Sequence, residues 1–458
     1  MSMKLPTQFH ESAAVIAWWR ARFGPVLRWQ VPARRRAILA IGSCVAAVVI
    51  PISILTESKA LAWRSEAPAV AAVIAILFAF LWLAHQAAAR FPQLPSPVRR
   101  HPQFALHFVY WAMLVVLWNT AAGAGPWRTV LFGMAVVFPF LLWRCGYLLL
   151  AGQHGRVAGT PFREHLIYLW PAYGGNNTPY GKGLDYLSRC EAKTEEDLAR
   201  SQLAGIRLLL LAALWGATLY VFEGIVYGDG NGFTRLAGGR TIGIPALGEL
   251  VKEGGGAPRG AAWASIYCEL MKQVLRHAAG SHGIIAVLRL FGFNVFRSTY
   301  KPLLAESVVE FWNRFYYYFK ELLVTFFFLP TFAGPGRKLR RWPRLRLFVA
   351  VFAAACIGNM YYHLIRLSAP LAQGDVLESI LAQRSRLFYC VLLAIGIFVS
   401  MLREQRRQGQ PAAPGGVRRL LRIFGVWTFF ATIWIWGVRG GAPFLARTEF
   451  FLGLLGLA

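Results

Sequence analysis

The chain has 458 residues, of which 56% are hydrophobic, 14% are aromatic and only 15% are charged. Together with a mean hydropathy of +0.45, this composition excludes an ordinary soluble domain and is typical of a polytopic membrane protein. The formal net charge of +28 does not indicate nucleic-acid binding, because the Lys and Arg residues stand in discrete clusters between apolar stretches.

The N-terminal segment, 1–34, is basic and contains several tryptophans. Within it, Ser12–Trp29 places Trp18 and Trp19 among arginines, which predicts an amphipathic helix. This helix would lie on anionic lipid at the cytoplasmic face or pack on the protein as an ordinary helix, and both interpretations stay open. The segment lacks an uninterrupted apolar core, so we expect no cleavable signal peptide. The remainder, 35–458, is interpreted as one multi-span domain.

Apolar stretches that approach the roughly 20 residues needed to cross a bilayer recur along this domain. The clearest are Arg36–Leu55, Ala69–Ala89, Ala105–Ala122, Trp127–Leu150, Leu203–Val226, Leu347–Leu364, Leu387–Leu402 and Leu420–Trp436. Two further regions, Ala261–Phe296 and Lys301–Pro330, are apolar but interrupted, and we expect short, tilted or re-entrant helices there. The predicted fold is all-α, with about 9–11 transmembrane helices plus re-entrant or tilted helices around a central tunnel.

The distribution of positive charge predicts the orientation of these spans. Basic residues gather in the N-terminal segment and in three later stretches, which are Arg90–Arg100, Arg337–Arg346 and Arg403–Arg422. Because cytoplasmic loops are enriched in Lys and Arg, all four clusters share one side if the N-terminus is cytoplasmic. This arrangement requires an odd number of crossings within Ala261–Pro330.

Two long polar loops interrupt the apolar pattern. Gly152–Arg200 contains Glu164 and His165, a weaker candidate site, and is interpreted as a folded cytoplasmic connector or as a substrate- or carrier-docking loop. Tyr227–Arg259 is rich in glycine and nearly neutral, which predicts a flexible external loop or a lid. The six cysteines are scattered without a Cys-x-x-Cys pair, so we expect neither a disulfide framework nor a zinc site.

The interrupted region 301–330 carries too many polar groups for a helix that faces lipid. Its polar residues include Glu306, Glu310, Asn313, Arg314, Lys320 and Glu321. Glu310 and Arg314 are four residues apart, so they can pair on one helical face, whereas Glu306 and Glu310 would repel each other at the same spacing. A cation such as Arg314 or Lys301 between the two glutamates would relieve this repulsion. Aromatic residues cover other angles of the same predicted helix, namely Trp312, Phe315, Tyr316 and Phe319.

One stretch of this region has the form of a family signature. Phe311–Tyr316 reads Phe-Trp-Asn-Arg-Phe-Tyr, and Pro330 follows nineteen positions after its first residue. A basic loop, Arg337–Arg346, then precedes an apolar helix that carries His363. From about residue 290 to 366 the chain resembles the membrane-bound O-acyltransferase family, and within it the bacterial members that transfer D-alanyl or acetyl groups to cell-envelope polymers.

The chain departs from the family pattern at two points. Many bacterial members carry a histidine where this chain has Tyr316, and the usual Gly-Leu-Trp-His context of the second histidine is here Met-Tyr-Tyr-His, ending at His363. Only one of the two family histidines is therefore present, which leaves His363 as the main catalytic candidate.

The resemblance implies direct acyl transfer from a cytoplasmic thioester to a hydroxyl group through a tunnel. His363 would act as the general base, and Tyr316 would orient the acyl donor through its hydroxyl. Asn313, Asn359 or Arg314 would stabilise the developing oxyanion. The residues expected to bind or support the substrates are Glu306, Glu310, Trp312, Arg314, Asn359 and Tyr362.

The resemblance also implies the partners of the reaction. The donor would be acyl-CoA or an acylated carrier protein, and the acceptor a glycan or lipid of the cell envelope. We expect no bound cofactor, no metal ion and no nucleic acid. The partners would be membrane lipids and a periplasmic or carrier protein, and the location would be the bacterial inner membrane with a cytoplasmic N-terminus.

Two other classes of protein stay open. The first is a catalytically inactive scaffold that resembles the membrane-bound O-acyltransferases (MBOAT), which is compatible with Tyr316 in place of histidine. The second is a transporter or flippase of envelope precursors, which would also use broken helices and buried polar residues. Taken alone, His363 fits an ordinary histidine near the end of a span. His277 and His282 border a predicted glycine break and would line the external mouth.

Overall fold

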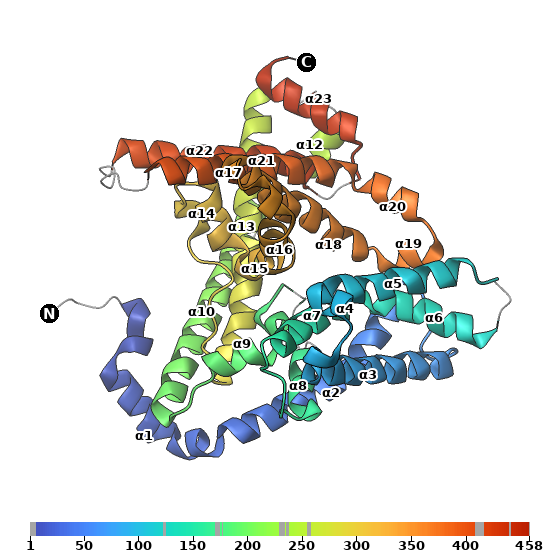
Figure 1. Cartoon of the computed structure of the whole chain (residues 1–458). Coiled ribbons are helices and arrows are strands. Elements are labelled where there is room, and N and C mark those ends of the chain that lie inside the picture. The colour runs from blue at the N-terminus through green and yellow to red at the C-terminus, as the bar shows by residue number, and fades with distance from the viewer. Residues whose placement is uncertain are drawn as a thin grey trace. The chain divides into compact units, whose positions relative to one another are not determined.

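The computed structural model describes residues 6–121, 125–169, 175, 177–228, 234, 238–253, 258–407, 416–438 and 441–457. Within these ranges the chain forms helices and connecting segments and no β-strand (Figure 1). Glu191 and Phe293 form an isolated antiparallel β-bridge. The predicted all-α fold is confirmed. The chain divides into unit 1 (Met1–Arg207, Ile284–Phe296 and Tyr362–Ile380) and unit 2 (Leu208–Gly283, Arg297–Tyr361 and Leu381–Ala458).

Unit 1 contains the N-terminal helices up to α9 and two short later helices. They are η1 (Pro6–Glu11), α1 (Ala13–Trp29), α2 (Pro32–Glu57), α3 (Ala67–Ala89), η2 (Phe91–Gln93), α4 (Ser96–Arg100), α5 (Pro102–Trp118), α6 (Pro126–Val137), α7 (Pro139–Gln153), α8 (Phe162–Leu169), η3 (Pro179–Lys182), α9 (Gly183–Cys190), α19 (Ser368–Gln373) and most of α20 (Val376–Ala382). Helix α3 packs against α6 and α7 and buries Leu77 and Leu81 completely or nearly so. The core of this unit is therefore a helix-on-helix packing of the predicted apolar stretches.

The predicted span Trp127–Leu150 is not one straight helix. It consists of α6 and α7, which are bent by 64° at a short break. Pro139 stands at the first position of α7, and a proline lacks the amide hydrogen that a continuous helix would use. The sequence stretch was correctly identified as apolar, but the proline divides it.

Helix α1 packs on the protein along one face. Ile16 and Leu27 are buried in a cluster with Leu198 and other residues of the same unit, and the indole nitrogen of Trp19 donates a hydrogen bond to Gln202 Oε1 at 2.9 Å. Trp18 is 59% exposed. The helix therefore packs on the protein, as one interpretation of the sequence predicts. It also leaves the Trp18 side chain exposed, as a helix that lies on lipid requires.

Unit 2 contains the larger parts of the two longest helices and the Phe-Trp-Asn-Arg stretch. Its elements are most of α10 (Glu195–Val226), α12 (Leu247–Glu253), most of α13 (Arg259–Leu290), η4 (Pro302–Leu304), α14 (Val308–Phe315), α15 (Tyr317–Leu323), η5 (Val324–Phe328), α16 (Leu329–Ala333), η6 (Pro335–Leu339), α17 (Pro343–Phe352), η7 (Ala353–Gly358), the start of α18 (Asn359–Ile365), α21 (Arg384–Arg407), α22 (Val417–Ile433), η8 (Trp434–Trp436) and α23 (Phe444–Leu455).

Short, tilted or re-entrant helices were expected in Ala261–Phe296, and the expectation of short or re-entrant ones was wrong. Helix α13 runs without a break for 32 residues. Gly280 and Gly283 lie inside it, and a single glycine in a helix costs only about 1 kcal/mol relative to alanine, which neighbouring turns can offset. For Lys301–Pro330 the prediction holds, because that region is divided into several short helices.

Two π-helical segments interrupt the helices on either side of the basic loop. They are η5, between α15 and α16, and η7, between α17 and α18, and they pack against each other. A Cβ atom on Gly358 would lie 2.6 Å from the ring of Phe327, closer than a methyl group can approach. The absence of a side chain at Gly358 therefore permits the contact. Single π-helical turns are frequent near functional sites.

The length and composition of the helices confirm an integral membrane protein with several spans. Among the described residues, six helices are long and apolar enough to cross a bilayer, and the bent pair α6 and α7 would make a seventh. This number is below the predicted about 9–11, because α5 has 17 residues and falls under the length limit and the region 301–330 is divided. The chain is thus an all-α polytopic protein.

Candidate functional site

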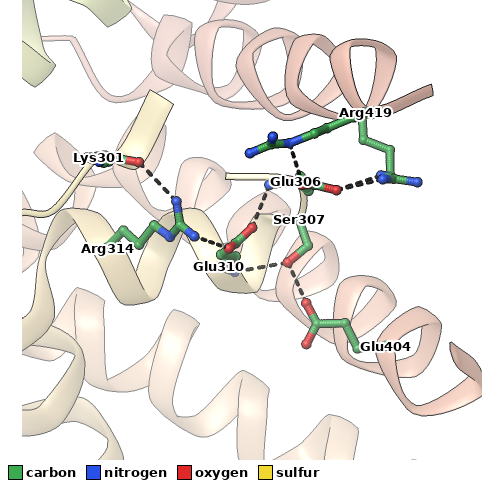
Figure 2. Close-up of polar contacts among 8 residues, drawn as sticks. Lys301, Glu306, Ser307, Glu310, Arg314, Glu404 and Arg419 are labelled. Carbon is green, nitrogen blue, oxygen red and sulfur yellow. Dashed lines mark hydrogen bonds and ion pairs between the residues drawn. The ribbon is translucent and has the colours of Figure 1, made fainter. Parts of the chain in front are cut away.

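Helix α14 carries the Phe-Trp-Asn-Arg stretch, and Ser307 caps its N-terminus. The Ser307 Oγ accepts a hydrogen bond from the Glu310 amide at 3.1 Å, and Glu310 Oε2 accepts one from the Glu306 amide at 2.6 Å (Figure 2). Side chains that accept these amides satisfy donors that have no partner inside the helix. The cap explains why the helix begins at Val308.

The carboxylate of Glu310 has a second role on the same helix. It forms an ion pair with Arg314, as the spacing of four residues predicts. Arg314 also donates from Nη1 to the backbone carbonyl of Lys301 at 3.3 Å (Figure 2). Of the two cations expected near the glutamates, Arg314 therefore contacts a carboxylate, whereas Lys301 contributes its backbone to Arg314.

Glu306 obtains its partners from a distant helix. Its two carboxylate oxygens accept hydrogen bonds from Arg419 at 2.9 Å and from Arg422 at 2.7 Å, both on α22. Burial by itself would raise the pKa of the Glu306 carboxyl, but hydrogen bonds and charge from Arg422 and Arg419 outweigh it and hold that pKa below its usual range. Ser307 donates its hydroxyl to Glu404 on α21 (Figure 2). The start of α14 is thus fixed by side chains of α21 and α22.

Tyr316 does not lie on a continuous helix, and the prediction of one was wrong. Helix α14 ends at Phe315, α15 begins at Tyr317, and Tyr316 between them has φ −128° and ψ 58°. The neighbouring non-helical segment at Ser298 and Thr299 takes the backbone groups that a helix would use. Thr299 Oγ1 donates to the Phe315 carbonyl at 2.8 Å, and the Tyr317 amide donates to the Ser298 carbonyl at 3.1 Å. The break therefore has partners for its free backbone groups.

His277 lies at this break rather than at the predicted glycine break. Its ring centroid is 4.1 Å from that of Tyr316 and 4.9 Å from that of Phe315. Its Nε2 atom is buried and has no hydrogen-bond partner in the described part of the chain. A buried polar atom without a partner is uncommon and calls for an explanation, such as a water or a ligand. No local pattern in the sequence indicates this contact, because His277 and Tyr316 lie far apart along the chain.

The remaining signature residues face different surroundings. The Trp312 side chain is buried, with its ring 6.3 Å from Tyr316 and 6.2 Å from Phe319. Asn313, predicted to contact the reacting group, is exposed on α14. Trp312 therefore packs among aromatic side chains, whereas Asn313 is exposed.

Asn359 and Tyr362 are buried, whereas His363 is partly exposed on the same helix, α18. The Asn359 side chain makes no hydrogen bond that can be identified among the described residues, although the residue is only 2% exposed. The rings of Tyr362 and His363 meet edge to face at 5.7 Å. Because His363 belongs to unit 1 and Tyr316 to unit 2, their convergence on one site stays a prediction.

The weaker candidate, Glu164 and His165, has structural partners within unit 1. His165 Nε2 lies 2.7 Å from Thr160 Oγ1, and its ring is 4.8 Å from that of His85. Burial, and then the neighbouring His85, lower the pKa of His165 to about 4, so this imidazole is neutral at pH 7. Glu164 pairs with Arg36 at 3.4 Å. These contacts are those of a packed helix end.

A scan against models of known protein families finds no match to this chain, and a search of curated proteins finds none either. In the described part of the chain no group of three or more His, Cys, Asp or Glu side chains is arranged to hold a metal ion.

Proposed function

We propose that this protein is an O-acyltransferase of a bacterial inner membrane, with its N-terminus in the cytoplasm. It moves an acyl group from a thioester, either acyl-CoA or an acylated carrier protein, to a hydroxyl of an envelope glycan or lipid. The observation that carries this proposal is the end of α14, where Tyr316 leaves the helix and lies against the imidazole of His277, whose buried Nε2 has no hydrogen-bond partner among the described residues. A phenol and an imidazole held together beside this helix can bind the acyl donor through hydrogen bonds and so orient it for attack.

In the proposed reaction His363 is the general base. The acceptor hydroxyl oxygen attacks the thioester carbonyl carbon while the neutral imidazole of His363 takes the hydroxyl proton. The carbon–sulfur bond then breaks, and the sulfur leaves with the proton from the imidazolium. The carboxamide of Asn359 has a free donor to offer to the oxyanion, and Tyr316 orients the donor through its hydroxyl.

The basic loop before α17 is suited to an anionic donor. Arg337, Arg340 and Arg344 are exposed there, whereas Arg346 is held by two hydrogen bonds to the Phe332 carbonyl, at 3.2 and 2.9 Å. Clustered positive charge raises the local concentration of anionic ligands. Coenzyme A and the phosphopantetheine arm of a carrier protein both carry phosphate, so either donor fits.

Replacing His363 with alanine tests the proposal. Loss of a general base typically costs about 10² to 10⁴ in rate, so we expect acylated envelope glycans or lipids to fall by at least about 100-fold. Mass spectrometry of surface glycans and lipids measures the acyl content, and immunoblotting measures the protein level. The matched control is His154→Ala, because His154 is an exposed histidine whose Nδ1 contacts only its own helix in the described structure.

Unchanged acylation in His363→Ala cells that contain normal amounts of protein would contradict the enzyme proposal. That result would favour a scaffold without catalytic activity. A loss in both His363→Ala and His154→Ala cells would also count against it, because a general base has to be distinguishable from an arbitrary histidine.

A further inference from the structure

Unit 1 contains a cavity of about 140 Å³ beside the end of α18. Helix α7 contributes Phe140 and Trp143 to its wall, the segment before η3 contributes Asn177, and the chain at the end of α18 contributes Tyr362 and Arg366. Sites that enclose a whole drug-sized ligand measure roughly 300 to 1,000 Å³. This cavity is less than half of the lower value, so it holds one functional group of a ligand rather than a whole ligand.

Two polar side chains that line the cavity, Arg366 and Asn177, are hydrogen-bond donors with few contacts among the described residues. The one contact found for the exposed Arg366 side chain, in the part of the chain that the structure describes, is with the Tyr362 ring, at 5.9 Å from the guanidinium carbon. The Asn177 carboxamide has no hydrogen bond that can be identified there. Arg144, which is 1% exposed, donates to the carbonyl of Gly175 in the cavity wall at 3.1 Å.

Among the described residues, none that lines the cavity is acidic. One guanidinium group, that of Arg366, lies in this lining, and that of Arg144 contacts the wall residue Gly175. Arginine binds phosphate and carboxylate groups through parallel hydrogen bonds. The charge and the donors together select an anionic group.

The position of Arg366 identifies the kind of anion. It follows directly after Pro343–Ile365, a 23-residue helical stretch that is long and apolar enough to cross the bilayer. A basic residue at the end of such a stretch lies at the level of the lipid headgroups, where phosphate is the common anion. The rings of Trp143 and Tyr362, 6.0 Å apart, provide an apolar surface for the organic part of a phosphate ester.

We propose that this cavity binds the phosphate group of a phosphate ester, with Arg366 and Asn177 as hydrogen-bond donors and Trp143 against the organic part. A membrane phospholipid and a soluble phosphate ester share this chemistry. The site does not depend on the acyl-transfer proposal: His363 is not among the residues that line the cavity, and phosphate binding can be measured without any acyl donor.

The test measures binding to the purified full-length protein. Native mass spectrometry records the retention of phosphatidylglycerol, of diacylglycerol with the same chains, and of glycerol 3-phosphate. The variants are Arg366→Gln, Arg366→Lys and the matched control Arg384→Gln. Arg384 is another exposed arginine for which no ion pair is found in the described part of the chain.

We expect Arg366→Gln to weaken binding of the phosphate ester by about tenfold or more, because a hydrogen bond to a charged group is lost. Arg366→Lys keeps the charge and should retain most of the affinity, and Arg384→Gln should match the wild type. Retention of phosphatidylglycerol without glycerol 3-phosphate identifies the lipid as the source, and the reverse identifies a soluble ester.

Three results would overturn the proposal. The first is equal affinity of the wild type and Arg366→Gln, and the second is equal retention of phosphatidylglycerol and the phosphate-free diacylglycerol. The third is the absence of binding of either phosphate ester to the wild type. Because Arg366 is exposed, its replacement by glutamine should leave the fold intact, and unchanged thermal unfolding of the variant checks this point.

Discussion

Tyr316 and His277 are far apart in the sequence, yet their side chains lie against each other in the structure. Their ring centroids are 4.1 Å apart, and the buried His277 Nε2 has no partner among the described residues. In the family that this chain resembles, many bacterial members carry a histidine at the position of Tyr316. Here an imidazole from α13 stands beside that position instead. We therefore infer that the pair can take over the role of a single histidine.

Replacing Tyr316 with phenylalanine tests the role of the hydroxyl. The variant keeps the ring that packs against His277, so we expect thermal stability close to that of the wild type. Acyl content of the envelope should fall by about 10-fold or more if acyl transfer is the function, because a hydrogen-bonding group at the proposed reaction site is lost. Tyr220→Phe, at a residue that is 46% exposed, is the control. Wild-type acylation in Tyr316→Phe would show that the hydroxyl is not needed.

At the scale of elements, the π-helical segments η5 and η7 determine how two interrupted helices pack. Each π-helical segment adds one residue to a helical turn, and this rotates the side chains that follow it around the helix axis. Asn359 is the first residue after η7, and the segment ends five residues before His363. The π-helical turn therefore sets the direction in which both candidate residues project.

Replacing Gly358 with alanine tests the contact between η5 and η7. The added methyl group would lie 2.6 Å from the Phe327 ring, and overpacking of this kind typically costs about 1–3 kcal/mol. Thermal unfolding of the purified protein should show a lower midpoint. Gly425→Ala is the matched control, because a Cβ there meets no atom within 4 Å and alanine favours a helix. Equal midpoints for the two variants would contradict the packing argument.

The sequence predicted the elements whose cause is local and missed those whose cause is distant. Apolar stretches identified α2 and α3 nearly to their ends, and the spacing of four residues identified the Glu310–Arg314 pair. The partners of Glu306 on α22 and the break at Tyr316 depend on contacts with other segments of the chain. Such contacts override local propensity and leave no periodic pattern.

At the scale of the whole molecule, the distribution of charge predicts the topology. The basic residues in and after the N-terminal segment, at Arg90–Arg100 and in the later clusters lie between apolar helices. Moving several of these charges across the membrane is unfavourable, and cytoplasmic loops retain them. The distribution of the net charge of +28 therefore predicts the orientation of the helices in the membrane. This orientation can be tested on one helix.

Helix α3 (Ala67–Ala89) provides that test, because Ala62 and Ser96 on either side of it are both exposed. We expect Ala62→Cys, in a variant without the native cysteines, to react with a membrane-impermeant maleimide in spheroplasts. Ser96→Cys should react only after permeabilisation, because Ser96 lies within Arg90–Arg100, the basic cluster that the charge distribution predicts to be cytoplasmic. The reverse pattern would invert the topology and place the proposed thioester-binding loop, Arg337–Arg346, outside the cell. Labelling of both positions from one side would mean that α3 does not cross the membrane.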